Sequence, residues 1–132
     1  MIDTLNIGSF IYETMINDET LTETLGVGDN IFPIVAEEGT NTPFVIYRRV
    51  GLISNCSKDG TYEDVVRVEI RAVCSTYEQS INIISRIREL FEKQYFRYGN
   101  MEINDVTIES ASENYEYNAF TQLINLNLKI NQ

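Results

Sequence analysis

The first hydrophobic pattern along the chain has the spacing of an amphipathic helix. Apolar residues recur every three or four positions and fall on one helical face: Ile7, Phe10, Ile11 and Met15. A second helical stretch begins at Asp18 and ends at Gly26, because glycine commonly follows the last turn of a helix. The pattern predicts one amphipathic helix with a break, packed on a flat surface.

Alternation of apolar and polar residues predicts the strongest strands. The segment from Tyr62 to Cys74 has valine, isoleucine, alanine and cysteine at its even positions from Val66 onward, and arginine or glutamate at several odd positions. The segment from Phe120 to Ile130 ends in a similar alternation. A period of two is typical of strands with one buried face and one solvated face.

Helical spacing returns between these two strands. Ser75 to Glu78 has the capping-box sequence with which many helices begin. The apolar residues that follow lie three or four positions apart: Ile81, Ile84, Ile87, Leu90 and Phe91. We predict a helix that starts at Ser75 and ends near Tyr95, followed by a turn over residues 97–100.

Weaker segments complete the predicted topology. Pro43 to Tyr47 and Ile103 to Ser110 have strand-like composition, whereas residues 51–61 and 114–118 are more polar and are predicted to connect the strands of two hairpins. Pro33 has no amide donor, so the short run around it belongs at a sheet edge or outside the sheet. The chain, residues 1–132, is therefore predicted to be one α+β domain: an antiparallel sheet of about four strands with two main helices packed on one face.

The sequence contains few groups suited to catalysis. It has no histidine, no glycine-rich phosphate loop and no cysteines in metal-ligand spacing. Two carboxylate pairs, Glu37–Glu38 and Glu63–Asp64, could hold a hard cation, but adjacent carboxylates in loops are ordinarily only solvated. We expect no enzyme activity, no metal and no cofactor. Cys74 ends an apolar strand face and is expected to be buried.

The net charge of −10 is unevenly distributed along the chain. Residues 1–47 contain eight acidic residues and no basic one. Residues 48–97 contain nine basic and seven acidic residues, and residues 99–132 contain five acidic residues and one basic residue, Lys129. Such an acidic chain does not offer a broad electrostatic surface to nucleic acid. The charge indicates either a solvated surface or acidic ends that meet the more basic middle of a neighbouring copy.

Tyrosine is concentrated in two patches, residues 95–98 and 115–117. Tyrosine and arginine are common interface anchors, but partly buried sheet rims have the same composition, and the sequence leaves both interpretations open. Stacking of nucleic-acid bases would also need a basic groove, and only Arg97 lies near. The chain shows neither a signal-peptide pattern nor an apolar run of about 18 residues, so we expect neither secretion nor a membrane span.

Several short motifs occur in the same order as in the tail-completion family of tailed phages. Gly28 to Pro33 is similar to the family's G-D-x-I-[FY]-P run, and Pro43 to Tyr47 is similar to its P-[FY]-[VI]-x-Y strand. Ser75 to Glu78 resembles the family's helix entry. Residues 114–118 and the alternating strand after them resemble its closing turn and last strand. The resemblance spans nearly the whole chain and departs from the family in the long polar segment 51–61.

This resemblance implies a structural protein of the virion, assembled in the cytoplasm of a host bacterium. It would form a ring, expected to be hexameric, that caps the tail tube and joins it to the head connector, and DNA would pass through without specific binding. The expected subunit or partner contacts are exposed charges and tyrosines: Arg48, Arg49, Arg67, Glu69, Arg71, Glu37, Glu38, Lys58, Asp59, Tyr115 and Tyr117. For Arg67, Glu69 and Arg71, a cross-strand charge ladder within one subunit is the other interpretation.

Two other function classes stay open at this point. One is a small-ligand-binding or regulatory α+β module, which a metabolite would stabilise against heat, whereas a ring would be stabilised by self-association. The other is a metal-dependent enzyme built on the two carboxylate pairs, which divalent ions would stabilise.

Overall fold

Six strands form one mixed sheet in the computed structural model, which describes residues 4–26, 30–56, 62–92 and 94–131. The strands lie in the order β1-β2-β3-β6-β5-β4. Every neighbouring pair is antiparallel except β1 and β2, which are parallel. The bounds are β1 Ile31–Pro33, β2 Phe44–Cys56, β3 Tyr62–Cys74, β4 Phe96–Tyr98, β5 Met101–Glu116 and β6 Ala119–Asn131.

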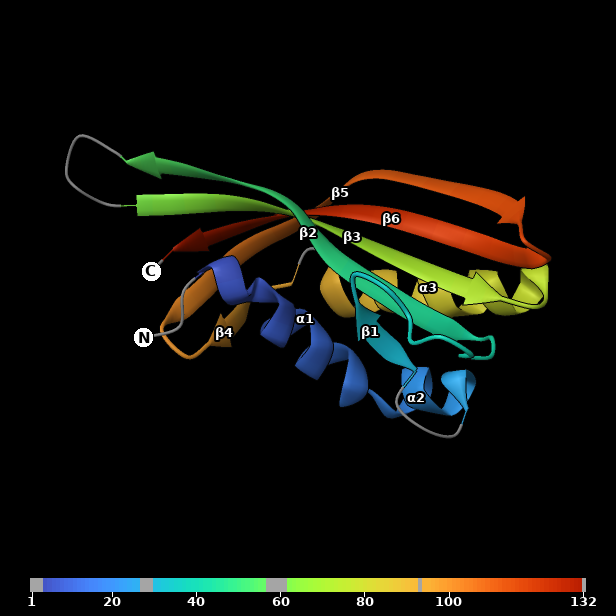
Figure 1. The fold of residues 1–132 in the computed structure, drawn as a ribbon. Coiled ribbons are helices and arrows are strands. Elements are labelled where there is room, and N and C mark those ends of the chain that lie inside the picture. The colour runs from blue at the N-terminus through green and yellow to red at the C-terminus, as the bar shows by residue number, and fades with distance from the viewer. Residues whose placement is uncertain (1–3, 27–29, 57–61, 93, 132) are drawn as a thin grey trace.

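Three α-helices cover one face of this sheet (Figure 1). Helix α1 (Ile7–Ile16) follows a 3₁₀ turn at Thr4–Asn6 and packs on β1 and β2. Helix α3 (Tyr77–Phe91) packs on β3 and β6, and the short α2 (Glu19–Leu25) contacts both other helices. In the described part of the chain, no helix has the length and apolar character needed to cross a membrane.

The predicted fold class is wrong in three respects. The sheet has six strands rather than about four, it is mixed rather than antiparallel, and three helices pack on it rather than two. The additional strands β1 and β4 have three residues each, which is too short for an alternating pattern to be recognised. The break in the first helical segment separates α1 from α2 completely.

Both predicted hairpin loops are largely strand. β2 continues to Cys56, because the residues from Gly51 pair one by one with β3; the rest of the expected loop lies outside the described residues. β5 continues to Glu116, so the turn to β6 consists of Tyr117 and Asn118 alone. Their φ angles of 51° and 60° have the signs of a type I′ turn, whose twist matches that of a hairpin.

The alternation in β3 and β6 is confirmed, and these two strands supply more than a third of the buried core. Their inward residues are buried against the helices: Val66, Val68, Ile70, Ala72, Cys74, Ile124, Leu126, Leu128 and Ile130. From α1, the ring of Phe10 meets Phe91, Phe96 and Tyr98 edge-on, with centroids 6.0, 5.0 and 5.8 Å apart. Two aromatic residues of the 95–98 patch, Phe96 and Tyr98, therefore pack against the core, while Tyr95 is exposed.

Side-chain caps set where two helices begin. The N-cap of α3 is Thr76 rather than the predicted Ser75: the Gln79 amide donates to the Thr76 hydroxyl at 3.2 Å. This helix ends at Phe91, earlier than the predicted Tyr95. Asp18 caps α2 by accepting a hydrogen bond from the Leu21 amide at 2.9 Å.

Candidate assembly surfaces

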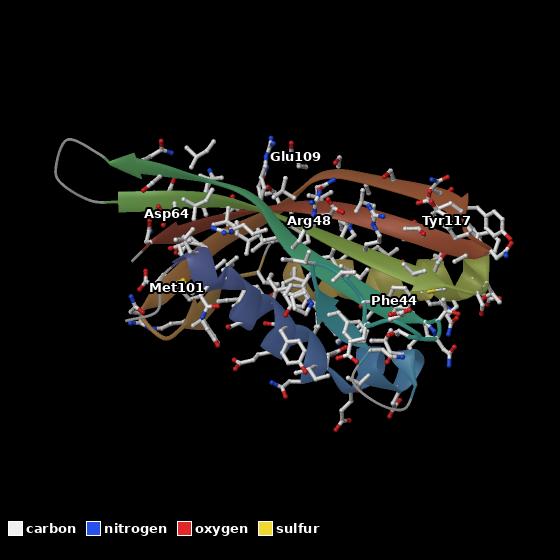
Figure 2. The ribbon with its side chains drawn as sticks, in the orientation of Figure 1. Phe44, Arg48, Asp64, Met101, Glu109 and Tyr117 are labelled. Atoms are coloured by element: carbon white, nitrogen blue, oxygen red, sulfur yellow. The ribbon has the colours of Figure 1, made fainter. Side chains whose placement is uncertain are left out.

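The outer face of the sheet, opposite the helices, carries cross-strand ion pairs. Glu69 of β3 lies between two arginines, and its carboxylate oxygens are 3.1 Å from Arg48 Nη2 and 3.2 Å from Arg71 Nη2. Arg67 of the same strand pairs with Glu109 of β5 at 2.6 Å. Figure 2 shows Arg48 and Glu109 on this side of the ribbon.

These contacts form the charge ladder within one subunit that the sequence left open as one interpretation. Arg48, Arg67 and Arg71 each have a carboxylate partner in the same chain, so this face needs no external anion for neutralisation. The side chain of Glu69 is only 14 % exposed, whereas those of Arg48 and Arg67 are more than half exposed. Pairs with such exposed partners contribute little stability, typically under about 1 kcal/mol each.

Arg49 lies apart from this network. It pairs in register with the buried Val68, so it projects to the helix side of the sheet, and it is exposed. Among the arginines that the structure describes, it is the one for which no ion pair is formed. It borders a shallow groove with Leu5, Pro33 and Ile34.

Glu37 and Glu38 lie in the loop between β1 and β2, away from the arginine network. Both are exposed, and the loop is closed by Thr40, whose amide and hydroxyl donate to the Glu37 carbonyl at 3.1 and 2.6 Å. Glu37 lines a polar groove that includes Asn30 and Thr42. The loop therefore presents carboxylates to solvent at the β1 edge of the sheet.

The other carboxylate pair does not form a joint ligand set. Glu63 and Asp64 are consecutive residues of β3, paired with Asn55 and Ser54 of β2. Successive strand residues point to opposite faces, so the two carboxylates diverge. In the segments that the structure describes, no three histidine, cysteine, aspartate or glutamate side chains gather as a metal site would require.

Tyr115 and Tyr117 lie at the tip of the β5–β6 hairpin, at the end of the molecule marked by Tyr117 in Figure 2. The ring of Tyr115 contacts that of Phe120 at a tilted angle, with centroids 4.7 Å apart, and Phe120 in turn meets Tyr77 of α3 edge-on at 5.9 Å. Tyr115 is half exposed, and Tyr117 is 96 % exposed. The first tyrosine is thus a rim residue held by aromatic neighbours, while the second presents its whole ring to solvent.

A hydrogen-bond network fixes the base of this hairpin to α3. The Glu113 carboxylate accepts from Tyr77 Oη at 2.9 Å and from Gln122 Nε2 at 2.9 Å, and Gln122 also reaches Ser80 at 3.3 Å. The hydrogen bonds from Gln122 and Tyr77 lower the pKa of Glu113, and the bond to Glu113 raises the pKa of Tyr77. The base of the tip is therefore anchored to α3.

Two of the predicted contact residues, Lys58 and Asp59, lie outside the described residues. Sequence reasoning also missed exposed apolar residues: Leu5, Ile34, Val35, Val50 and Ile53. Their only sequence signal is that Ile34 and Val35 follow Pro33, in a run too short to be assigned a face.

Comparison with known proteins defines the fold and leaves the family open. No protein-family model and no curated protein sequence matches this chain. Among solved structures, the fold is similar to that of a chain from the virion of a native gene transfer agent particle, with a TM-score of 0.79. The alignment covers 92 % of each chain at 8 % sequence identity. The chain therefore shares its fold, over almost its whole length, with a component of a virion particle.

Proposed function

We propose that this protein is a structural component of a phage-type virion. The observation that carries the proposal is the similarity to a gene transfer agent virion chain over 92 % of both chains. It agrees in kind with the independent sequence resemblance to the phage tail-completion family, which also spans nearly the whole chain. The scarcity of catalytic side chains in the sequence, which contains no histidine, supports a role in assembly rather than in a reaction.

Within the virion, the proposed role is a ring at the head–tail junction, a tail terminator or neck component that caps the tail tube and contacts the head connector. A closed ring needs two different surfaces on each subunit. Two separate surfaces are available, because β1 lies at one edge of the sheet and the turn of the β5–β6 hairpin projects from strands on the other side of β3 (Figure 1). A net charge of −10 suits a channel that DNA passes without being gripped.

The mass of the protein in solution tests this role. We expect light scattering across a concentration series to give a multiple of 15.2 kDa that rises toward a hexamer, and negative-stain images to show rings with a central channel. Addition of purified tail tubes should then place the ring at one end of each tube.

A strictly monomeric protein that binds no tail component would contradict the proposal. In that event the small-ligand module becomes the leading interpretation. Its site would be the polar groove beside Asn30, Glu37 and Thr42, and its signature would be thermal stabilisation by a metabolite rather than by protein concentration.

A further inference from the structure

Three exposed aliphatic residues and one arginine form a patch beside the end of β1. Leu5, Ile34 and Val35 are 57 %, 73 % and 70 % exposed, and Arg49 borders the same groove as Leu5 and Ile34. Single exposed aliphatic residues are common, but Leu5 and Ile34 come from separate chain segments and line one groove, and Val35 follows in the same turn, which indicates a contact surface. We call these four residues the aliphatic–arginine patch.

The backbone of this patch is held in a strained turn. The Val35 amide donates to the Pro33 carbonyl at 2.6 Å, which makes Ile34 the central residue of a γ-turn, and its φ is 65°. Positive φ is costly for a β-branched residue, and strain of this kind clusters at binding surfaces. The Ile34 amide also donates to the Tyr47 carbonyl at 2.8 Å, which fixes the turn on β2. The strain presents an apolar side chain to solvent.

The charge of the patch calls for a carboxylate from outside the subunit. In the described part of the chain, Arg48, Arg67, Arg71, Arg86, Arg88 and Arg97 all have carboxylate partners, and Arg49 does not. An exposed guanidinium beside aliphatic side chains suits a partner that offers one carboxylate together with apolar or aromatic rings.

The tip of the β5–β6 hairpin has this chemistry. Tyr115, Glu116 and Tyr117 are exposed, and within the described residues Glu116 forms no ion pair. Tyrosine is common among the residues that dominate binding at interfaces, and the hydrogen bonds at the hairpin base hold this turn against α3. We call these three residues the tyrosine–glutamate tip.

We infer that the tyrosine–glutamate tip of one copy binds the aliphatic–arginine patch of the next copy. In this contact Glu116 pairs with the neighbour's Arg49, and the tyrosine rings cover the neighbour's Leu5, Ile34 and Val35. This inference rests on the proposed function, because the contact that it names is the one between neighbouring subunits of the proposed ring.

Self-contacts of either surface are disfavoured, which is why a second copy is bound head to tail. Two tips facing each other would bring two Glu116 carboxylates together, and two patches would bring two Arg49 guanidiniums together. The tip and the patch lie on opposite sides of β3 in the sheet. When the tip of one copy binds the patch of the next, the pair therefore still has one free tip and one free patch, to which further copies can bind. Such a contact closes into a ring or extends into a filament.

Charge reversal with rescue tests the pairing of Glu116 with Arg49. Arg49→Glu and Glu116→Arg should each weaken self-association by at least about tenfold, measured by sedimentation over a concentration series. The double variant Arg49→Glu/Glu116→Arg should recover association to within about threefold of wild type, because the pair is restored with its signs exchanged. Glu23→Arg, a charge reversal on α2 outside both surfaces, is the matched control and should leave association unchanged.

Mixing two defective chains tests the head-to-tail arrangement. Arg49→Glu has an intact tip and a defective patch, whereas Tyr117→Asp has an intact patch and a defective tip. Each alone should be a monomer of about 15.2 kDa, and their equimolar mixture should stop at a heterodimer of twice that mass, since only one functional contact remains. Circular dichroism melts of each variant establish that it is folded.

The outcomes separate this inference from the proposed function. Wild-type rings that persist unchanged in both single charge variants would overturn the tip–patch contact and leave the ring standing. A wild-type protein that stays monomeric at every concentration would overturn both.

Discussion

Arg86 of α3 donates two hydrogen bonds to Asp18 at the start of α2, from Nε to Oδ2 at 2.9 Å and from Nη2 to Oδ1 at 2.6 Å. The same carboxylate accepts the Leu21 amide and so caps α2. One side chain thus starts a helix of seven residues and attaches it to the next helix. A helix this short is not stable in isolation, so the contact with α3 holds it in place.

We expect Asp18→Ala to lower the free energy of unfolding by about 1–2 kcal/mol, because it removes an N-cap. Urea denaturation measures the change, which should appear in the midpoint without a change in slope. Glu23→Ala is the matched control, since Glu23 is an exposed carboxylate of the same helix for which no ion pair is seen. An equal loss in both variants would contradict the role of Asp18.

The contribution of Asp18 should also depend on pH. The hydrogen bond from Arg86 holds the pKa of Asp18 below its usual value, so the folded state favours the charged form. A depressed folded pKa gives stability that is complete above the unfolded pKa, about 3.9, and is lost as the pH falls through the folded value. The stability difference between wild type and Asp18→Asn should therefore shrink between pH 6 and pH 2.5, and a constant difference would argue against the linkage.

The ion pairs on the outer face should matter little for stability. Glu69→Gln removes the partner of both Arg48 and Arg71, and because both arginines reach solvent we expect a loss under about 1 kcal/mol. Glu109→Gln, which removes only the partner of Arg67, should cost less. Neither variant should change the mass of the assembly, because these pairs are satisfied within one subunit; a shift to monomers would place this face in the contact.

The hydrogen bond between Tyr77 and Glu113 at the base of the β5–β6 hairpin should be detectable in the pKa of Tyr77. The hydrogen bond to Glu113 raises the pKa of Tyr77, so Glu113→Gln should lower it toward the usual value of about 10. NMR of ¹³C-labelled tyrosine, with Tyr77→Phe used to assign the resonance, measures this pKa directly. Because the folded pKa is raised, the contribution of Tyr77 to stability is present at neutral pH and is lost as the pH rises through the folded value. A Tyr77 titration that is the same in Glu113→Gln and wild type would refute the contact.

Replacement of Ile34 by glycine should raise the stability of the subunit and weaken its self-association. Ile34→Gly relieves about 1–2 kcal/mol of steric cost at positive φ and adds up to about 1 kcal/mol of backbone entropy cost, so we expect a net gain near 0.5 kcal/mol. The lost side chain should weaken self-association. Ile34→Ala separates the two effects, because it removes the contact and retains the strain. Thermal melts of dilute protein, together with sedimentation, check both variants.

Cys74 should be chemically inert in the folded protein. Its side chain is fully buried, as expected from the sequence, and burial raises its pKa to about 11. In a Cys56→Ser background, a thiol reagent at pH 8 should react with Cys74 at least ~100-fold more slowly in buffer than in 6 M guanidinium chloride. Rapid reaction of the folded protein would show that this end of β3 opens readily.

The sequence predicted the elements that carry their own pattern and failed where a partner determines the structure. β3 and the end of β6 alternate by themselves, and α1 and α3 have helical spacing, so these could be read directly. The stretch from Gly51 to Asn55 has no alternating pattern and leads into a polar segment, so it looks like the start of a loop, but it lies opposite β3, and pairing along that strand makes it a strand. Likewise the end of β5 is extended because β6 lies beside it.

Prediction of the candidate surfaces was uneven for a similar reason. Tyr115, Tyr117 and Arg49 stand out by residue type, and the structure shows all three exposed. Leu5 and Ile34 belong to no periodic pattern that would assign them to a surface, because the groove that they share is created by a tight turn after β1. Conversely, Arg67, Glu69 and Arg71 have the composition of a contact surface, although their partners lie within the same sheet.

The lengths of β1 and β4 have a consequence for the protein before it assembles. β1 pairs with β2 only as far as Tyr47, and β4 pairs with β5 only as far as Ile103, so in the described part of the chain long outer edges of β2 and β5 have no neighbouring strand. Unpaired strand edges recruit other edges indiscriminately. In the proposed role as a virion component, the synthesis of this chain would have to keep pace with its incorporation, because free copies in excess would expose these edges to one another.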